Sequence, residues 1–120
     1  MMENIRRMHS TARMSQLVVH DDRLYLAGQV ADDTTADIAG QAQQVLEKIE
    51  GLLAEAGCDK TMLLSAMIWL SDIANYDAFN AVWDNWLPAG HAPVRACVEA
   101  KLAGSQYLVE VSIVAAHAMS

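Results

Sequence analysis

Positive charge is scarce in this chain of 120 residues. Lysine and arginine together number 8 against 15 aspartates and glutamates, so the formal net charge is −7. Affinity for nucleic acid depends on clustered cations that contact phosphates, and Arg6-Arg7 is the only adjacent basic pair. The composition therefore argues against nucleic acid and against anionic membrane surfaces as partners.

Cysteine is also rare, because Cys58 and Cys97 are the only two and no C-x-x-C or zinc-type spacing occurs. No apolar run approaches the roughly 20 residues of a transmembrane helix, and the N-terminus lacks the apolar core of a signal peptide. We therefore expect a reduced, cytoplasmic protein. Two interpretations of Cys97 stay open, a reactive thiol and a buried inert one.

Apolar side chains, by contrast, are abundant. They make up 53% of the residues and include seven methionines and three tryptophans. A monomer of this length buries only about two-thirds of the surface of its unfolded chain, so much apolar surface would stay outside the core. Exposed apolar patches usually mark interfaces. We expect one domain, spanning residues 1–120, that associates with other copies.

Apolar periodicity predicts five strands and two helices. Runs with strand character lie at 14–19, 24–30, 62–70, 94–102 and 107–116. Apolar residues at helical spacing predict a helix of about 22 residues that ends at Gly57, and a second helix over 73–87. The order β-β-α-β-α-β-β favours an α+β fold in which two helices cover one face of a sheet. The other sheet face would be bare in a monomer.

Three local signals refine this outline. Thr34 and Asp37 have the spacing of a capping box at the start of the first helix. Asn75 is a candidate N-cap for the second. Gly28, inside an apolar run, indicates a β-bulge or a close approach of another group to the backbone.

The stretch over 93–100, Pro-Val-Arg-Ala-Cys-Val-Glu-Ala, places one arginine in an otherwise apolar strand. Side chains alternate between the two faces of a strand, so Arg95, Cys97 and Glu99 share one face. The planar guanidinium suits a carboxylate bound by two parallel hydrogen bonds. The alternative is an exposed or ion-paired arginine with no ligand, and the spacing leaves both open.

The order of the elements, together with short motifs along the chain, resembles the RidA/YjgF family, also called the endoribonuclease L-PSP family. The resemblance covers residues 13–116, almost the whole chain. The motifs are Ser15-Gln16, Gly28-Gln29-Val30, Asn80 within Phe-Asn-Ala-Val-Trp, the 93–100 strand and Val109-Glu110-Val111.

This resemblance implies a chorismate-mutase-like α+β fold and a homotrimer with three pockets at the subunit interfaces. It also implies that Arg95 binds the carboxylate of a small substrate. The family activity that it implies is hydrolysis of enamines and imines to 2-keto acids and ammonia, with no cofactor or metal. In imine hydrolysis the substrate must be held, a water must be aimed at the imine carbon, and protons must be transferred.

The sequence departs from the family pattern in the expected pocket. In that pattern the last strand carries two glutamates two residues apart, and the second orients the attacking water. Glu110 keeps the first position, while Ser112 occupies the second, and a serine hydroxyl is not a base near neutral pH without help. Met14 stands where the family has a tyrosine, and Ala27 where it has a serine.

The resemblance therefore implies the following site. The expected catalytic residues are Arg95, Ser112 and Glu110, and the expected substrate-binding residues are Arg95, Cys97, Gly28, Asn80 and Met14. For Glu110 and Asn80 the structural alternatives, a paired or edge carboxylate and a capping or helix-surface amide, stay open.

The sequence leaves three functions open. The first is a trimeric hydrolase of small 2-imino acids, and the second is a non-catalytic module that binds 2-keto acids or other small carboxylates. The second follows from keeping Arg95 while Ser112 replaces the water-orienting glutamate. The third, a ribonuclease or translation inhibitor, is opposed by the negative net charge.

Overall fold

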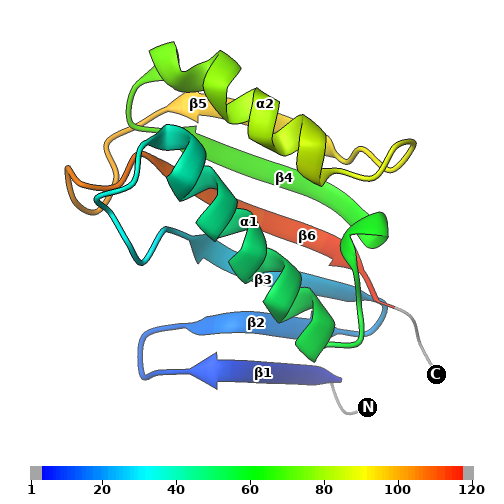
Figure 1. Ribbon diagram of the computed structural model, residues 1–120. Coiled ribbons are helices and arrows are strands. Elements are labelled where there is room, and N and C mark those ends of the chain that lie inside the picture. The colour runs from blue at the N-terminus through cyan, green and yellow to red at the C-terminus, as the bar shows by residue number, and fades with distance from the viewer. Residues whose placement is uncertain (1–3, 118–120) are drawn as a thin grey trace.

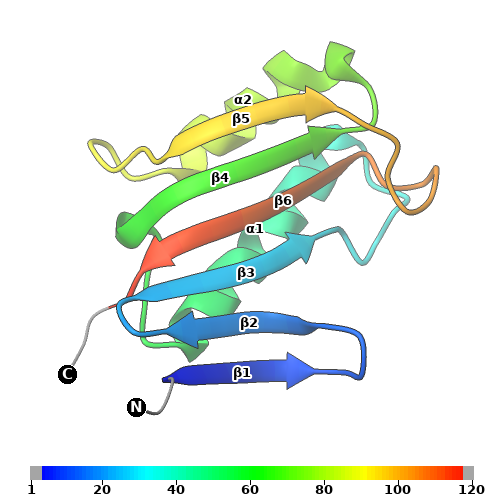
Figure 2. The ribbon, with the colours of Figure 1, turned by 180° about the vertical axis from the view of Figure 1, so that it is seen from behind.

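Two helices lie on one face of a six-stranded sheet and leave the other face uncovered (Figures 1 and 2). The computed structural model describes residues 4–117. Its strands are β1 (Ile5–Ser10), β2 (Ser15–His20), β3 (Arg23–Gln29), β4 (Leu63–Leu70), β5 (Val94–Glu99) and β6 (Val109–Ala116). Its helices are α1 (Ile38–Glu55) and α2 (Tyr76–Trp86), with short 3₁₀ turns at Lys60–Met62 and Ile73–Asn75.

The strand order across the sheet is β1-β2-β3-β6-β4-β5. All neighbouring strands are antiparallel except β4 and β5, which are parallel and joined through α2. The α+β class and the two helices on one face are thus confirmed. Neither helix within residues 4–117 is both long and apolar enough to cross a membrane.

Strand β1 is not among the five strands that apolar periodicity predicts. Its sequence, Ile-Arg-Arg-Met-His-Ser, is polar and does not alternate clearly. As an edge strand it pairs only with β2 and places only Met8 against the core, opposite Leu17. The predicted strand over 94–102 also proved too long, because β5 ends at Glu99.

Alternation along the strands decides which side chains meet the helices. In β6, Val109, Val111 and Ile113 are buried beneath α1 and α2, while Glu110 and Ser112 point to the uncovered face. The bulge predicted at Gly28 is present, as a register shift between Leu26 and Gln29 where β3 pairs with β6. The same alternation places Arg95 on the face that the helices cover and Glu110 and Ser112 on the uncovered face.

Asp37 begins α1 as its N-cap, and its carboxylate accepts a hydrogen bond from Gly40 N at 2.9 Å. The predicted capping box, in which Asp37 is the fourth residue, is therefore wrong, and the helix has 18 residues rather than about 22. Asp33 closes a local turn instead, because its Oδ1 accepts hydrogen bonds from Thr35. Gly57 follows the helix with a positive φ of 72°, as expected for a residue that ends a helix.

Gln41 is a fully buried polar side chain that ties α1 to the loop before β6. Its Nε2 donates to the carbonyl of Gln106 at 3.1 Å, and its Oε1 accepts from Leu108 N at 2.9 Å. The same Nε2 also contacts the carbonyl oxygens of Thr34 and Ala36. Buried polar groups of this kind stabilise a fold only while they stay paired.

We expect Gln41→Ala to lower the free energy of unfolding by about 2–4 kcal/mol, because Leu108 N–H loses its buried acceptor. The matched control is Gln43→Ala, on the exposed side of α1, which should change it by less than about 0.5 kcal/mol. Urea unfolding followed by tryptophan fluorescence, at equal protein concentration, measures both. Equal midpoints for the two variants would contradict this account.

Candidate functional site

Arg95 lies on β5, the edge strand of the sheet, and its side chain turns toward α2. Its NH2 donates a hydrogen bond to Asn80 Oδ1 at 2.7 Å and lies 3.5 Å from Tyr76 Oη. Tyr76 and Asn80 are four residues apart and therefore share one side of α2. The helix thus fixes the guanidinium from one side.

Aromatic rings surround the same guanidinium. Arg95 Cζ lies 5.4 Å from the ring centre of Trp83, 5.8 Å from that of Tyr76 and 6.0 Å from that of Phe79. The negative face of an aromatic ring attracts a cation, and the planar guanidinium packs well on it. These contacts restrict the orientation of the guanidinium without neutralising its charge.

No carboxylate pairs with this cation in the part of the chain that the structure describes. The ion pairs found there all involve other residues. Glu99, on the same face of β5, instead accepts a hydrogen bond from Ile73 N at 3.0 Å. Arg95 is thus a half-buried, oriented cation that still has N–H donors to offer.

Cys97 lies two residues beyond Arg95 on the same face, half-buried against the core. Burial raises the pKa of the Cys97 thiol, and the nearby positive charge of Arg95 opposes this only in part. A raised pKa keeps the sulfur protonated at neutral pH, whereas a nucleophilic cysteine needs a thiolate. The structure favours a packing role for Cys97.

Glu110 and Gly28 meet on the uncovered face of the sheet, where β6 lies beside β3. A Cβ atom at position 28 would collide with Glu110 Oε2 and lie 2.8 Å from its Cδ. Glycine at the bulge thus lets the carboxylate lie against the backbone, and a side chain there would displace it. Within residues 4–117 no hydrogen bond or ion pair holds this half-buried carboxylate.

Ser112 lies two residues beyond Glu110 on the same face of β6. It borders a shallow hollow of about 420 Å³ over β5, β4 and β6. The hollow is lined by Ser65, Ala66, Met67, Val94, Arg95, Ala96, Ser112 and Val114. Among residues 4–117 no three His, Cys, Asp or Glu side chains gather as they would around a metal ion.

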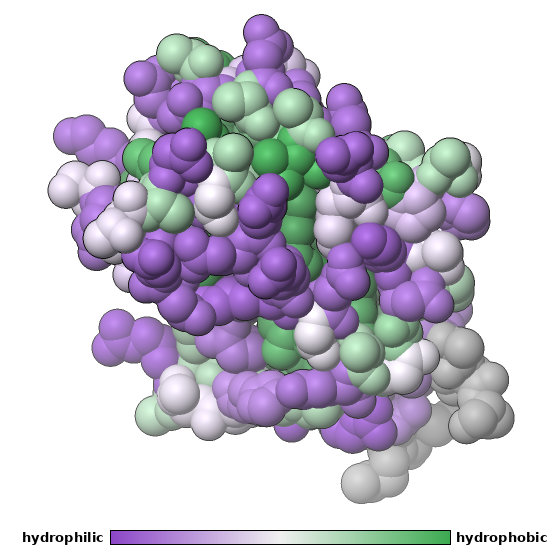
Figure 3. Space-filling view, viewed as in Figure 1, coloured by the Kyte–Doolittle hydropathy of each residue, from purple (hydrophilic) through white to green (hydrophobic). Residues whose placement is uncertain are grey.

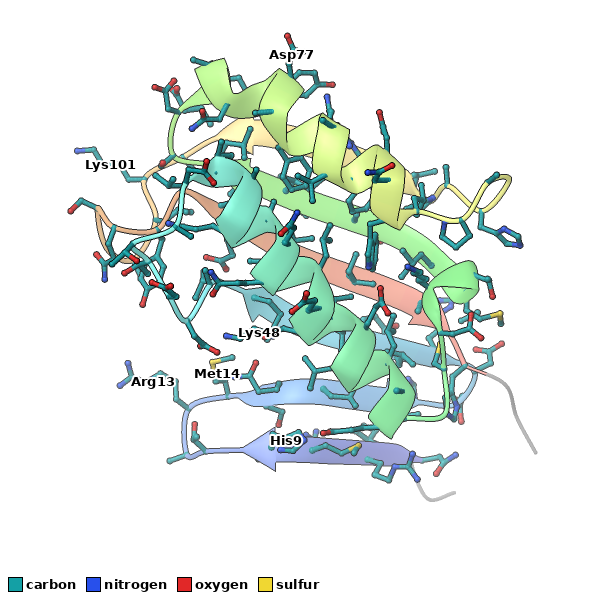
Figure 4. The ribbon with its side chains drawn as sticks, viewed as in Figure 1. His9, Arg13, Met14, Lys48, Asp77 and Lys101 are labelled. Carbon is teal, nitrogen blue, oxygen red and sulfur yellow. The ribbon has the colours of Figure 1, made fainter. Side chains whose placement is uncertain are left out.

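One chain does not assemble the expected site into a single pocket. Arg95, Asn80 and Cys97 lie together on the helix side of β5, while Glu110 and Ser112 lie on the uncovered side of β6, with β4 between the two strands. Met14, just before β2, lies toward the opposite edge of the sheet (Figure 4). Apart from Met14, the residues form two groups on opposite faces of the sheet. Arg95 and Ser112 both border the hollow, but the side chain of Arg95 turns to α2.

Tyr76 and Trp83 belong to the surroundings of Arg95, and neither is among the site residues expected from the sequence. Tyr76 is 41% exposed, and its hydroxyl lies beside the guanidinium. A signal was present, because positions 76, 80 and 83 have the spacing of one helix side. The sequence alone does not show which strand this side of α2 covers.

Comparisons with known proteins bear on the family and the fold of this chain. The family model for Endoribonuclease L-PSP matches residues 4–117. The chain is 41% identical over 110 residues to the RutC family protein YoaB of Escherichia coli, covering 92% of this chain and 96% of that protein.

Solved structures and a more distant relative give the same result. A YjgF family protein from Neisseria meningitidis superimposes with a TM-score of 0.94 at 39% identity, covering 98% of each chain. Human 2-iminobutanoate/2-iminopropanoate deaminase is 27% identical over 124 residues, covering 92% of this chain and 90% of that protein. The motifs, the topology and these matches together show that this chain belongs to the RidA/YjgF family.

Proposed function

We propose that this protein binds small carboxylates through Arg95 and hydrolyses 2-imino acids to 2-keto acids and ammonia. The observation that carries the proposal is the state of Arg95, which is oriented by Asn80 and three aromatic rings but has no carboxylate partner among the described residues. A ligand carboxylate would supply the missing partner through two parallel hydrogen bonds.

The reaction is carried over from the human relative, whose name states an imine deaminase, at 27% identity. The residues needed for such chemistry are present here, although they are spread over two surfaces. Arg95 supplies the binding group, and Glu110, unpaired beside Gly28, supplies a carboxylate that can act as a base.

A homotrimer would bring the two groups of residues together. The uncovered sheet face is largely apolar and includes Tyr25, Met67, Trp69, Val94 and Val98, of which Val94 is 74% exposed. Such a face packs favourably against other copies. In our proposal each pocket lies between two copies, one giving Arg95 and Asn80 and the other giving Glu110 and Gly28.

The proposed step adds water across the C=N bond. The carboxylate of the substrate binds Arg95, the water oxygen bonds to the imine carbon, and Glu110 takes a proton from that water. That proton passes to the imine nitrogen and gives a carbinolamine. Glu110 then transfers the proton of the new hydroxyl to the amino nitrogen, the C=O bond forms as the C–N bond breaks, and ammonia leaves a 2-keto acid. Ser112 can hydrogen-bond the water but needs Glu110 as the base.

A binding module without catalysis is the second candidate, and Ser112 is the observation that favours it. The hydroxyl occupies the position where the family pattern expects a glutamate that orients water. In that case the same Arg95 pocket would bind 2-keto acids without turnover. The experiments below separate the two functions.

The first prediction concerns Arg95. An amino-acid oxidase generates 2-imino acids while semicarbazide traps the remaining imine, and the wild type should lower the trapped amount. Arg95→Ala should reduce kcat/KM by at least about 100-fold, since it removes a charge-assisted pair of hydrogen bonds. The kcat/KM of Arg95→Lys should lie between the values of the wild type and of Arg95→Ala, because lysine keeps the charge and lacks the planar guanidinium.

The control for this assay is Arg6→Ala, which removes an exposed arginine from β1 at the opposite edge of the sheet. It should leave turnover unchanged. Full activity in Arg95→Ala would overturn the carboxylate site. A third outcome is that neither the wild type nor any variant removes imine. If the wild type then still binds 2-keto acids and Arg95→Ala does not, the protein is a binding module.

The second prediction concerns Glu110. Glu110→Gln keeps the shape of the side chain above Gly28 and removes its capacity to accept a proton. We expect kcat to fall by about 100-fold, within the usual range for loss of a general base, with the Kd for 2-keto acids changed by less than about threefold. Isothermal titration calorimetry gives the Kd, and an undiminished kcat would remove Glu110 from the mechanism.

The third prediction separates orientation of Arg95 from direct ligand binding by Asn80. Asn80→Asp is nearly isosteric and gives Arg95 a carboxylate in place of the amide that it now contacts at 2.7 Å. It should weaken 2-keto acid binding more than Asn80→Ala does, by about tenfold or more, since an internal ion pair competes with the ligand. Equal losses in both variants would indicate that Asn80 contacts the ligand itself.

A further inference from the structure

A groove runs between α1 and α2 on the surface that faces away from the sheet, and its volume is about 620 Å³. Figure 3 shows this side of the molecule, where a band of apolar residues lies between polar ones. The groove is lined by Ala39, Gln43, Leu46, Glu47, Glu50, Ala78, Ala81, Val82, Asn85 and Trp86. None of these residues belongs to the proposed carboxylate site.

Small side chains keep this groove open. Ala39 on α1 and Ala78 and Ala81 on α2 present only methyl groups to it, above a floor that includes Leu46 and Val82. The two helices run in the same direction across the sheet, so the groove follows both (Figure 1). Its apolar floor is the kind of surface that receives one face of an amphipathic helix.

Carboxylates lie in the groove on the α1 side and outside it on α2. Glu47 and Glu50 of α1 line the groove. Asp77 and Asp84 are exposed on α2 outside the lining, and Figure 4 shows Asp77 pointing away from α1. No lysine or arginine occurs in α2. The single basic residue of α1, Lys48, is bound to the Val30 carbonyl at 2.8 Å and to Asp32 at 2.7 Å, both outside the groove.

One corner of the groove already holds an ammonium group. Lys60 Nζ lies 2.9 Å from Glu50 Oε1 and 5.2 Å from the ring centre of Trp86. Trp86 Nε1 donates to the same carboxylate oxygen at 2.5 Å. This corner shows that a carboxylate and a ring at the groove accept a lysine head group, and Glu47 offers a second carboxylate without such a partner among the described residues.

We propose that the α1–α2 groove docks a basic amphipathic helix of a partner protein. Apolar side chains of that helix would enter the groove, and lysines or arginines on one flank would meet Glu47. Basic residues on the other flank would lie over the exposed side of α2, which carries Asp77 and Asp84. Charge complementarity of this kind sets partner choice and speeds association. The helices of a second copy do not fit, since they carry the same acidic residues.

The test uses a synthetic 18-residue helical peptide with leucines along one side and lysines flanking them, labelled for fluorescence anisotropy. The control peptide has the same leucines and glutamate in place of each lysine. We expect the basic peptide to bind the wild type at least tenfold more tightly than the acidic one. This preference should weaken between 50 mM and 300 mM salt.

Matched variants separate the groove from the overall charge of the protein. Glu47→Lys, at the groove, should weaken binding of the basic peptide about fivefold or more at low salt. Asp22→Lys, which makes the same change in net charge in the β2–β3 turn, should change it by less than twofold. Ala78→Leu, or Ala81→Leu if the former does not fold, should fill the groove and weaken binding at both salt concentrations.

Three results would overturn the proposal. Equal affinities for the two peptides would exclude recognition of basic residues. Equal effects of Glu47→Lys and Asp22→Lys would assign the attraction to the overall field of the protein. A changed oligomeric state in Ala78→Leu, measured by sedimentation velocity, would show that the groove lies between copies of this chain.

Discussion

The pleat of the sheet is the constraint on which the rest of this protein depends. Because side chains alternate between faces, one strand step decides whether a residue meets the helices or the uncovered surface. It places Arg95 under α2 and Glu110 on the other face, so the two groups cannot meet within one chain. In our proposal, an active site that uses both residues requires assembly, which would also cover the apolar face.

The guanidinium of Arg95 shows how a fold can hold an unpaired charge. Partial burial of a cation is unfavourable unless other groups replace its contacts with water. Here one amide oxygen and the ring faces of Tyr76, Phe79 and Trp83 do so without adding negative charge. A carboxylate at position 80 would hold the cation more firmly, but it would compete with a ligand carboxylate for the same donors.

Much of this fold could be predicted from the sequence, because it rests on local periodicity. The helices, the bulge at Gly28 and the faces of Glu110 and Ser112 follow from apolar spacing and turn residues. Strand β1 could not be found in this way, since an edge strand needs few buried side chains. The contact of Glu110 with Gly28 also depends on strand order, which brings β3 beside β6 and which local patterns do not contain.

Helix α2 has different chemistry on each of its sides. Tyr76 and Asn80 face Arg95, Phe79 and Trp83 fill the core, and Ala78, Ala81 and Val82 line the groove beside α1. Because 11 residues serve all three surfaces, a shift of this helix at the groove would move the amide that orients the guanidinium. Coupling between a docked helix and ligand affinity would therefore act through a rigid shift of α2, and linkage would make it reciprocal.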